Sequence, residues 1–376
     1  MLRKSINLLI LLCVSTIVGS LGRFDVRSFA DLDRLIGHVP AEVVMRLRAI
    51  DTGRGSEALY RNQLPALLTE LANRARIQSI TASSAIEGVV VPDARRAERI
   101  IDGSAGALRN RSEQELAGYR KALDYLFQED WHPLNVGLLL HLHRLLWSET
   151  ALDGGRLKTD DNLVVDRSPD GITTVRFTPV AAAKTEVYLS DLVDRYLEAQ
   201  REGRHHPVLV VALAILDLLV IHPFADGNGR VARALTNALL VDAGYEVCRW
   251  VSMEQLIAES ADGYYDALLR STDDWHDDAA DPWPWLSYFV GVLASAYETF
   301  ARRAAANRSG GTKQERVRTH ILKHAGPVFR LAEVRAALPG VSDQTIRLVL
   351  EQLKAEQLVS PEGAGRGAVW RRSPTP

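Results

Sequence analysis

The chain has 376 residues, of which 47% are hydrophobic and 24% charged, which is typical of a globular protein with room for two or three domains. Its formal net charge of −2 argues against a protein that coats nucleic acid along its whole length, although a local basic module stays open. The two cysteines, Cys13 and Cys248, are too far apart in sequence for a disulfide framework or a cysteine metal site. A reducing compartment fits this cysteine usage best.

The N-terminus leaves two interpretations open. Arg3 and Lys4 precede an apolar stretch from residue 6 to residue 18, a pattern typical of a signal-peptide core or a marginal membrane anchor within residues 5–22. The alternative is that the natural start lies downstream and that the first domain begins near Phe24.

Most of the chain up to residue 305 carries helical spacing. Leucines at three- and four-residue intervals predict an amphipathic helix over 61–76, and a second helix is expected over 80–87, ending at Gly88. The run from Val208 to Ile221 is almost wholly apolar, but at fourteen residues it predicts a buried core helix rather than a membrane span. Further helices are expected over 113–130, 134–148, 231–243 and 282–303.

Residues 162–178 break the helical pattern. Two β-branched runs flank Pro-Asp-Gly at 169–171, which predicts a β-hairpin of unknown register. This is the strongest β signal in the first 300 residues.

The last 70 residues form a separate unit. A Gly- and Ser-containing linker at 306–312 precedes expected helices at 313–324, 331–338 and 342–354, the last capped by Ser342, and then a hairpin with a glycine-rich tip. This order predicts a winged helix-turn-helix domain over 313–372. Eleven Lys or Arg face six Asp or Glu from residue 312 onward, so DNA binding is one interpretation, and dimerisation or target docking by the same fold is the other.

Residues 222–233 are the most informative segment: His-Pro-Phe-Ala-Asp-Gly-Asn-Gly-Arg-Val-Ala-Arg. A glycine-containing loop that feeds a helix N-terminus presents unpaired N–H groups to an anion such as phosphate. His222 is the group here that titrates near neutrality and can take a proton from a hydroxyl. Asp226 is a hard oxygen ligand suited to Mg²⁺, while Phe224 is expected to point into the core.

The remaining polar groups of the segment suit a phosphate ligand. Asn228 can donate its amide to a phosphate oxygen, and Arg230 and Arg233, three residues apart, can both reach one ligand. Taken singly, a histidine at a helix end, a Gly-Asn-Gly turn and two arginines are usually structural or solvated. Their occurrence together in twelve residues favours the functional interpretation.

This segment resembles the Fic motif, H-x-F-x-(D/E)-G-N-G-R-x-x-R, at every specified position. The resemblance covers roughly residues 24–305, including 113–119, the Leu-His pairs at 140–143, and 263–265. It implies a mainly α Fic-type core with a hairpin flap, and transfer of AMP from ATP to a protein Ser, Thr or Tyr hydroxyl with release of pyrophosphate. The implied divisions are 1–22 (apolar segment), 24–110 (N-terminal helices with an inhibitory helix), 111–305 (Fic core), 306–312 (linker) and 313–372 (winged helix).

The same resemblance implies the roles of the site residues. His222 deprotonates the target hydroxyl, Asp226 holds Mg²⁺, and the nest of Gly227, Asn228 and Gly229 binds the α- and β-phosphates together with Arg230. Arg233 faces the γ-phosphate. The hairpin at 162–178 resembles the flap that aligns the target segment by strand addition.

A second, shorter motif lies upstream. Ser83, Glu87 and Gly88 match (S/T)-x-x-x-E-(G/N), the family's inhibitory motif. Glu87 is expected to pair with Arg233 and so to hold ATP in an unproductive pose.

Three functions stay open at this point. The first is an autoinhibited protein adenylyltransferase with ATP as substrate and Mg²⁺ as cofactor. The second is a Fic-type de-AMPylase or a transferase using another nucleotide, and the third is a DNA-binding regulator whose Fic core senses nucleotide. Because ATP is a cytoplasmic substrate, a cytoplasmic location is expected, with or without an anchor. The expected partner is a protein substrate, including the chain itself, and a homodimer stays open.

Overall fold

The computed structural model describes residues 29, 32–167, 173–277, 279–308, 312–362 and 369–373. The apolar segment 1–22, the turn of the hairpin at 168–172, the linker centre at 309–311 and the glycine-rich tip at 363–368 lie outside the described residues. Within the described part, no helix combines the length and the apolar character that crossing a bilayer requires.

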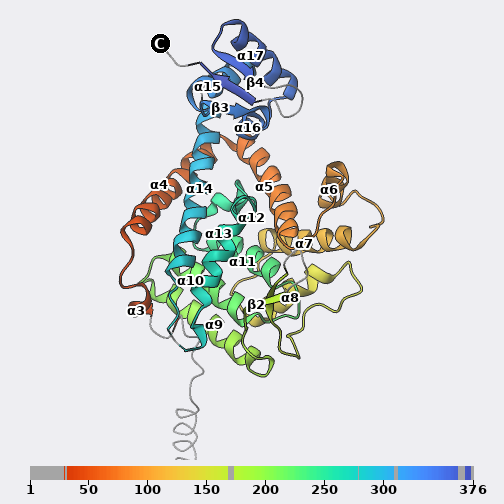
Figure 1. Ribbon diagram of the computed structural model, residues 1–376, viewed down its shortest axis with the longest axis vertical. Coiled ribbons are helices and arrows are strands. Elements are labelled where there is room, and N and C mark those ends of the chain that lie inside the picture. Colours follow the sequence, from red (N-terminus) through yellow and green to blue (C-terminus); the bar gives the residue numbers. More distant parts are fainter. Residues whose placement is uncertain are drawn as a thin grey trace, which may run out of the picture.

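The main body is helical, and a small hairpin interrupts the helices (Figure 1). Its first helices are α3 (Leu32–Ile36), α4 (Ala41–Gln63), α5 (Pro65–Ile86), α6 (Ala94–Ile101), α7 (Arg111–Gln128) and α8 (Val136–Trp147). After the hairpin follow α9 (Ala182–Glu202), α10 (Pro207–Ile221), α11 (Asn228–Asp242), η1 (Glu246–Arg249), α12 (Met253–Glu259), α13 (Ala261–Thr272), η2 (Trp275–Asp277) and α14 (Trp283–Arg308). This mainly helical body agrees with the fold class that the sequence predicted.

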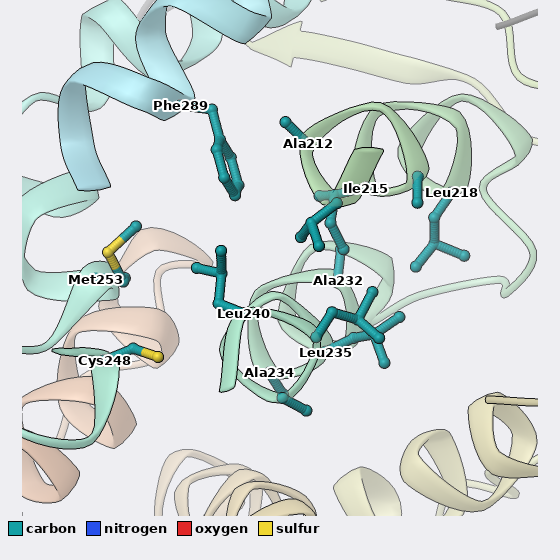
Figure 2. Packing of buried hydrophobic residues seen from close by; sticks show 14 of the residues in the cluster. Ala212, Ile215, Leu218, Ala232, Ala234, Leu235, Leu240, Cys248, Met253 and Phe289 are labelled. Carbon is teal, nitrogen blue, oxygen red and sulfur yellow. The ribbon is translucent and has the colours of Figure 1, made fainter. Parts of the chain in front are cut away.

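Helix α10 forms the centre of the body. Thirteen of its fifteen residues are buried, because α9, α11 and α14 pack around it. Figure 2 shows its side chains Ala212, Ile215 and Leu218 beside Ala232 and Leu235 of α11. The prediction of a buried core helix rather than a membrane span is confirmed, and the position of α10 fixes the loop that follows it.

The prediction of two helices over 61–76 and 80–87 is wrong. The break lies earlier, at Leu64, and Pro65 begins the single long helix α5. Proline suits this first position because its missing N–H would have no helical partner there. The predicted end is correct: α5 stops at Ile86, Glu87 is its C-cap, and Gly88 takes a φ of 75°.

The hairpin lies where the sequence predicted it. Strands β1 (Val164–Arg167) and β2 (Thr173–Phe177) are antiparallel, with Val165 opposite Val175. A register shift between Val164 and Val165 interrupts the ladder. The hairpin forms a two-stranded sheet of its own.

The C-terminal module follows α14 at the far end of that helix (Figure 1). It contains α15 (Lys313–Lys323), β3 (Val328–Arg330), α16 (Leu331–Ala337), α17 (Asp343–Ala355), β4 (Val359–Glu362) and β5 (Val369–Arg372), with strand order β3-β5-β4. It has its own apolar core, which includes Val317, Phe329 and Leu350. Ser342 caps α17 by accepting from Thr345 N at 3.2 Å, as predicted, whereas β3 was not predicted.

Candidate functional site

His222 lies where the buried helix α10 ends. It is the C-cap of that helix, and its φ of 50° and ψ of 60° are in the left-handed region, which non-glycine residues rarely adopt. Its Nδ1 lies 3.1 Å from the carbonyl oxygen of Leu219. Because that oxygen can only accept, this hydrogen bond requires the proton on Nδ1 and leaves Nε2 with a free lone pair. The ring is therefore held in the tautomer that a general base needs.

The surroundings favour the neutral form of His222. Burial lowers its pKa, and the positive charge of Lys158 acts in the same direction. The hydrogen bond to Leu219 and the negative charges of Glu87 and Asp226 oppose this shift without reversing it. At neutral pH the ring is thus predominantly uncharged and able to accept a proton.

The loop after His222 is fixed from inside by Asn228 and by close packing. Asn228 Nδ2 donates to Phe224 O at 2.8 Å, while Phe224 N donates to Asn228 Oδ1 at 2.9 Å. Phe224 is fully buried, as the sequence predicted. Gly227 has a φ of 83°, and a Cβ there would lie 2.7 Å from Leu146. Asn228 thus clamps the loop in this structure, and its contact with phosphate stays a prediction.

Arg230 and Arg233 face different neighbours. Arg230 Nη1 donates to Glu115 Oε2 of α7 at 2.6 Å, and the guanidinium stands over the Trp147 ring at 4.8 Å. Arg233 contacts α5 instead. Of the two, Arg233 lines the cavity beside His222, and Arg230 is absent from the described lining residues. The expectation that both arginines reach one ligand stays a prediction.

Arg233 is bound to the predicted inhibitory motif. Its Nη2 donates to Glu87 Oε1 at 2.7 Å and to Ser83 O at 3.1 Å, and its Nε donates to Ser83 Oγ at 2.9 Å. Burial favours a higher pKa for Glu87, but the charge and hydrogen bond of Arg233 outweigh it and lower that pKa. The carboxylate is therefore ionised and paired at neutral pH.

The Glu87 carboxylate also lies against the loop that the sequence predicts to bind phosphate. A Cβ on Gly229 would lie 2.4 Å from Glu87 Oε1, so the carboxylate lies directly beside the first turn of α11. The N-terminus of a helix attracts anions, and here the carboxylate is the anion that it meets. Glu87 and a nucleotide phosphate would compete for this position.

These groups share one cavity of about 580 Å³. The flap contributes Val164, Val165, Arg176 and Phe177, and α13 contributes Tyr264, Tyr265, Leu268 and Leu269; His222, Asp226, Gly227, Asn228, Gly229, Arg233 and Glu87 complete the polar part. Arg176 stands over the Tyr265 ring at 4.8 Å and so connects the flap to α13. A cavity with an apolar wall and a polar anion-binding wall suits a nucleotide.

Asp226 is the carboxylate that suits a metal ion in this cavity. It is exposed, and it accepts a hydrogen bond from Gly227 N at 2.6 Å. No cluster of three or more metal-binding side chains occurs among the described residues. One carboxylate fits Mg²⁺ that arrives with nucleotide phosphates, because Mg²⁺ is usually held by one or two carboxylates, substrate oxygens and water.

Three supporting residues were not assigned from the sequence. Glu115 pairs with Arg230, and Lys158 donates to the C-terminal end of α10. His143 stacks on Phe224 at 4.0 Å; Gly155 N donates to its Nδ1, and its Nε2 lies 3.0 Å from Asp226 O and 2.8 Å from Trp147 Nε1. Burial lowers the pKa of His143 to about 4, so it is neutral. The segment 113–119, which contains Glu115, and the Leu-His pairs at 140–143 belonged to the family resemblance, whereas no local signal indicated Lys158.

Comparison with known proteins agrees with this site. Residues 133–240, which include α8, the flap, α10 and the loop with His222, match the model of the Fic/DOC family. The match supports a place for the chain in the Fic superfamily.

Two curated relatives carry adenylyltransferase names. Protein adenylyltransferase fic-1 of Caenorhabditis briggsae is 29% identical over 140 residues, which are 36% of this chain and 25% of the relative. Protein adenylyltransferase Fic of Drosophila grimshawi is 28% identical over 226 residues, covering 58% of this chain and 44% of the relative. The chain therefore spans less than half the length of these relatives.

A solved structure shares the fold. A Fic family protein from Desulfovibrio desulfuricans superposes with a TM-score of 0.58 at 21% identity, covering 90% of this chain and 98% of that protein. This likeness concerns the fold alone. It is consistent with a Fic-type helical core.

Proposed function

We propose that this protein is an autoinhibited protein adenylyltransferase that moves AMP from ATP to a Ser, Thr or Tyr hydroxyl of a protein. The observation that carries the proposal is the 2.7 Å pair between Arg233 and Glu87 in the same cavity as His222. A cavity with a base, an anion-binding helix terminus and an arginine suits nucleotide chemistry. A carboxylate on that arginine suits control of the same chemistry.

In the proposed reaction, His222 Nε2 takes the proton from the target hydroxyl. The hydroxyl oxygen bonds to the α-phosphorus of ATP, the bond from that phosphorus to the bridging oxygen breaks, and pyrophosphate leaves. The backbone N–H groups of 227–229 bind the α- and β-phosphates. Asp226 would hold Mg²⁺ that arrives with the nucleotide, and the ion would supply positive charge where negative charge develops. The relatives' names support this chemistry at the level of the family.

The inhibition follows from competition for one guanidinium. Arg233 is 4% exposed and its Nη2 already donates to Glu87, so a γ-phosphate that binds this Nη2 would have to displace the carboxylate. With Glu87 in place, the triphosphate is held away from the pose that aligns its α-phosphorus with the hydroxyl. Misalignment of this kind lowers the rate without abolishing binding.

The flap gives the target a docking edge. Leu163, Val165 and Val175 are exposed on or beside the hairpin, although large apolar side chains usually avoid solvent. A target segment that adds a strand to this edge would cover them and would bring its hydroxyl toward His222.

The C-terminal module is assigned to one of two roles. Gln344, Arg347 and Lys354 are exposed on α17, which supports phosphate or base contacts if the module is a winged helix that binds DNA. Dimerisation or docking of the target is the other role. A mobility shift at two salt concentrations distinguishes them, because phosphate contacts weaken steeply with salt.

The proposal is tested with ATP carrying label on either the α- or the γ-phosphate. Wild-type protein, Glu87→Gly and the double variant Glu87→Gly/His222→Ala are incubated with Mg²⁺ and each nucleotide. We expect protein-bound label from the α-phosphate alone, strong in Glu87→Gly and absent in the double variant. Label from the γ-phosphate would indicate phosphoryl transfer, and release of AMP from modified protein by the wild type would favour the reverse reaction. Either outcome would overturn the proposal.

A further inference from the structure

The short segment 158–162, which leads into the flap, is joined to the loop that carries the base. Lys158 N donates to Pro223 O at 2.9 Å, and Lys158 Nζ donates to Ile221 O at 3.1 Å. Asn162 Nδ2 donates to Phe224 O at 3.1 Å. Three of the four carbonyl groups from 221 to 224 thus accept a hydrogen bond from this one segment.

Lys158 and Asn162 also bind each other. Lys158 Nζ donates to Asn162 Oδ1 at 2.9 Å, so the two side chains act as one unit against the loop. Lys158 is 6% exposed, an unusual burial for a lysine. Its ammonium group contacts Ile221 O, the last carbonyl of α10, where the helix dipole favours a positive charge. A buried ammonium group that donates both to Ile221 O and to Asn162 Oδ1 at this position has a specific structural task.

That task is visible in the backbone of His222. A non-glycine residue in the left-handed region costs about 1–3 kcal/mol and persists only where its surroundings hold it. Lys158 holds the peptide group that precedes His222 through its side chain, and the peptide group that follows Pro223 through its backbone N–H. The side chain of Asn162 then holds the next carbonyl.

We propose that Lys158, together with Asn162, is a positioning residue that holds the general base His222 in its reactive conformation. The role of His222 as the general base rests on the proposed function. The positioning of His222 by Lys158 and Asn162 rests on the hydrogen bonds alone. Asn162 is two residues before Val164, the first residue of β1, so the strap formed by residues 158–162 connects the target-docking flap to the base. Docking of a target strand on the flap would therefore affect the position of His222 through this strap.

The first test compares rates in the Glu87→Gly background. Lys158→Met removes the charge and the donors at similar length, Lys158→Arg retains both, and Asn162→Ala removes only the distal contact. Lys184→Met is the matched control, because Lys184 is exposed on α9. We expect kcat to fall about tenfold or more in Lys158→Met and several-fold in Asn162→Ala, since small misplacements of a catalytic group are costly. KM for ATP should stay within about twofold, because the phosphate-binding groups are untouched. Lys158→Arg should recover most of kcat, because it retains the charge and the donors.

The second test observes the His222 ring directly, without catalytic turnover. The ring signals of His222 in an NMR spectrum of histidine-labelled protein are identified by their loss in His222→Ala. We expect these signals to shift in Lys158→Met and Asn162→Ala and to stay in place in Lys184→Met. Thermal unfolding shows whether each protein is folded. If Lys158→Met does not fold, Asn162→Ala decides, because it leaves the contact of Lys158 with Ile221 intact.

The outcomes separate the two proposals. Unchanged His222 signals in the folded Lys158→Met protein, or in Asn162→Ala if that protein does not fold, would overturn the positioning role. An equal loss of kcat in Lys184→Met would also overturn it. If no variant labels protein, the parent included, the transferase proposal fails, while the NMR comparison still decides on the positioning of His222.

Discussion

Arg230 and Arg233 lie one turn apart on α11, and both are almost inaccessible to solvent, but the carboxylates that neutralise them differ in exposure. The Glu115 side chain beside Arg230 is 5% exposed, whereas the Glu87 side chain beside Arg233 is 31% exposed. Glu115 belongs to the second turn of α7, and Glu87 is the C-cap of α5, where the helix dipole disfavours a negative charge. One pair is therefore built into the core, and the other can open.

The difference shows how one motif combines a fixed part with a movable part. Arg230 with Glu115 ties α11 to α7. Arg233 is held from one side by Ser83 and from the other by Glu87, which reaches into the cavity. In the proposed switch, a nucleotide phosphate replaces the carboxylate of Glu87, whereas the carboxylate of Glu115 stays buried with Arg230.

The largest expected effect tests the fixed pair. Glu115→Ala leaves Arg230 buried without its partner, and loss of one member of a buried ion pair costs about 3–5 kcal/mol in the free energy of unfolding. Chemical denaturation measures this loss. Labelling by α-labelled ATP should not increase, and an increase would mean that this pair, too, is inhibitory.

The next effect tests the movable pair. Glu87→Gly frees Arg233 for the γ-phosphate, and we expect the labelling rate to rise about tenfold or more, as suits release of one charge-assisted hydrogen bond. The unfolding free energy should change less than in Glu115→Ala, because the site is open to water. Initial labelling rates and chemical denaturation of the same preparations provide the measurement. Equal labelling rates in Glu87→Gly and wild type would contradict the inhibitory role of Glu87.

A smaller effect is expected from Ser83→Ala. This variant removes the hydroxyl that accepts from Arg233 Nε but leaves Glu87 in place. Loss of one such hydrogen bond costs about 1 kcal/mol, so the pair with Glu87 should loosen and labelling should rise by about fivefold or less. Ser84→Ala is the matched control, because Ser84 Oγ donates to Ile80 O within its own helix.

The smallest effect concerns pH. Because Arg233 lowers the pKa of Glu87 below its ordinary value of 4.5, the inhibitory pair is complete above that value and is lost only as the pH falls through the lowered pKa. The ratio of labelling rates between Glu87→Gly and wild type should thus stay within about twofold from pH 6 to pH 8. Removal of Glu87 takes away one charge that raises the pKa of His222, but burial keeps that pKa below its ordinary value, so the ring is mostly neutral near pH 7 and above in both proteins and contributes little to the ratio there. A steep fall of the ratio within this range would mean that another group controls the pair.

The contrast between the two arginines also separates what the sequence predicts from what it leaves open. His222, Gly227 and Arg233 could be predicted because loop, base and helix start are contiguous, and Glu87 followed from a second local motif. The partner of Arg230 could not be predicted, because Glu115 lies 115 residues away in the sequence and contacts Arg230 only after α7 packs against α11. Helical spacing alone placed both arginines on one face.

Other features were hidden for similar physical reasons. The break between α4 and α5 was missed because the leucine spacing continues across Leu64, although Pro65 marks the new helix. Strand β3 has only three residues, too few for an alternating pattern, and is defined by its pairing with β5. Lys158 precedes the flap by several residues, and nothing local indicates that its side chain is buried against α10.

The most direct test of the switch is the intact mass of wild-type and Glu87→Gly protein after incubation with ATP and Mg²⁺. The account predicts a covalent adduct of one AMP on Glu87→Gly, little or none on the wild type, and none when His222→Ala is added. No adduct on Glu87→Gly, with or without candidate target proteins, or equal adducts on Glu87→Gly and wild type, would contradict it.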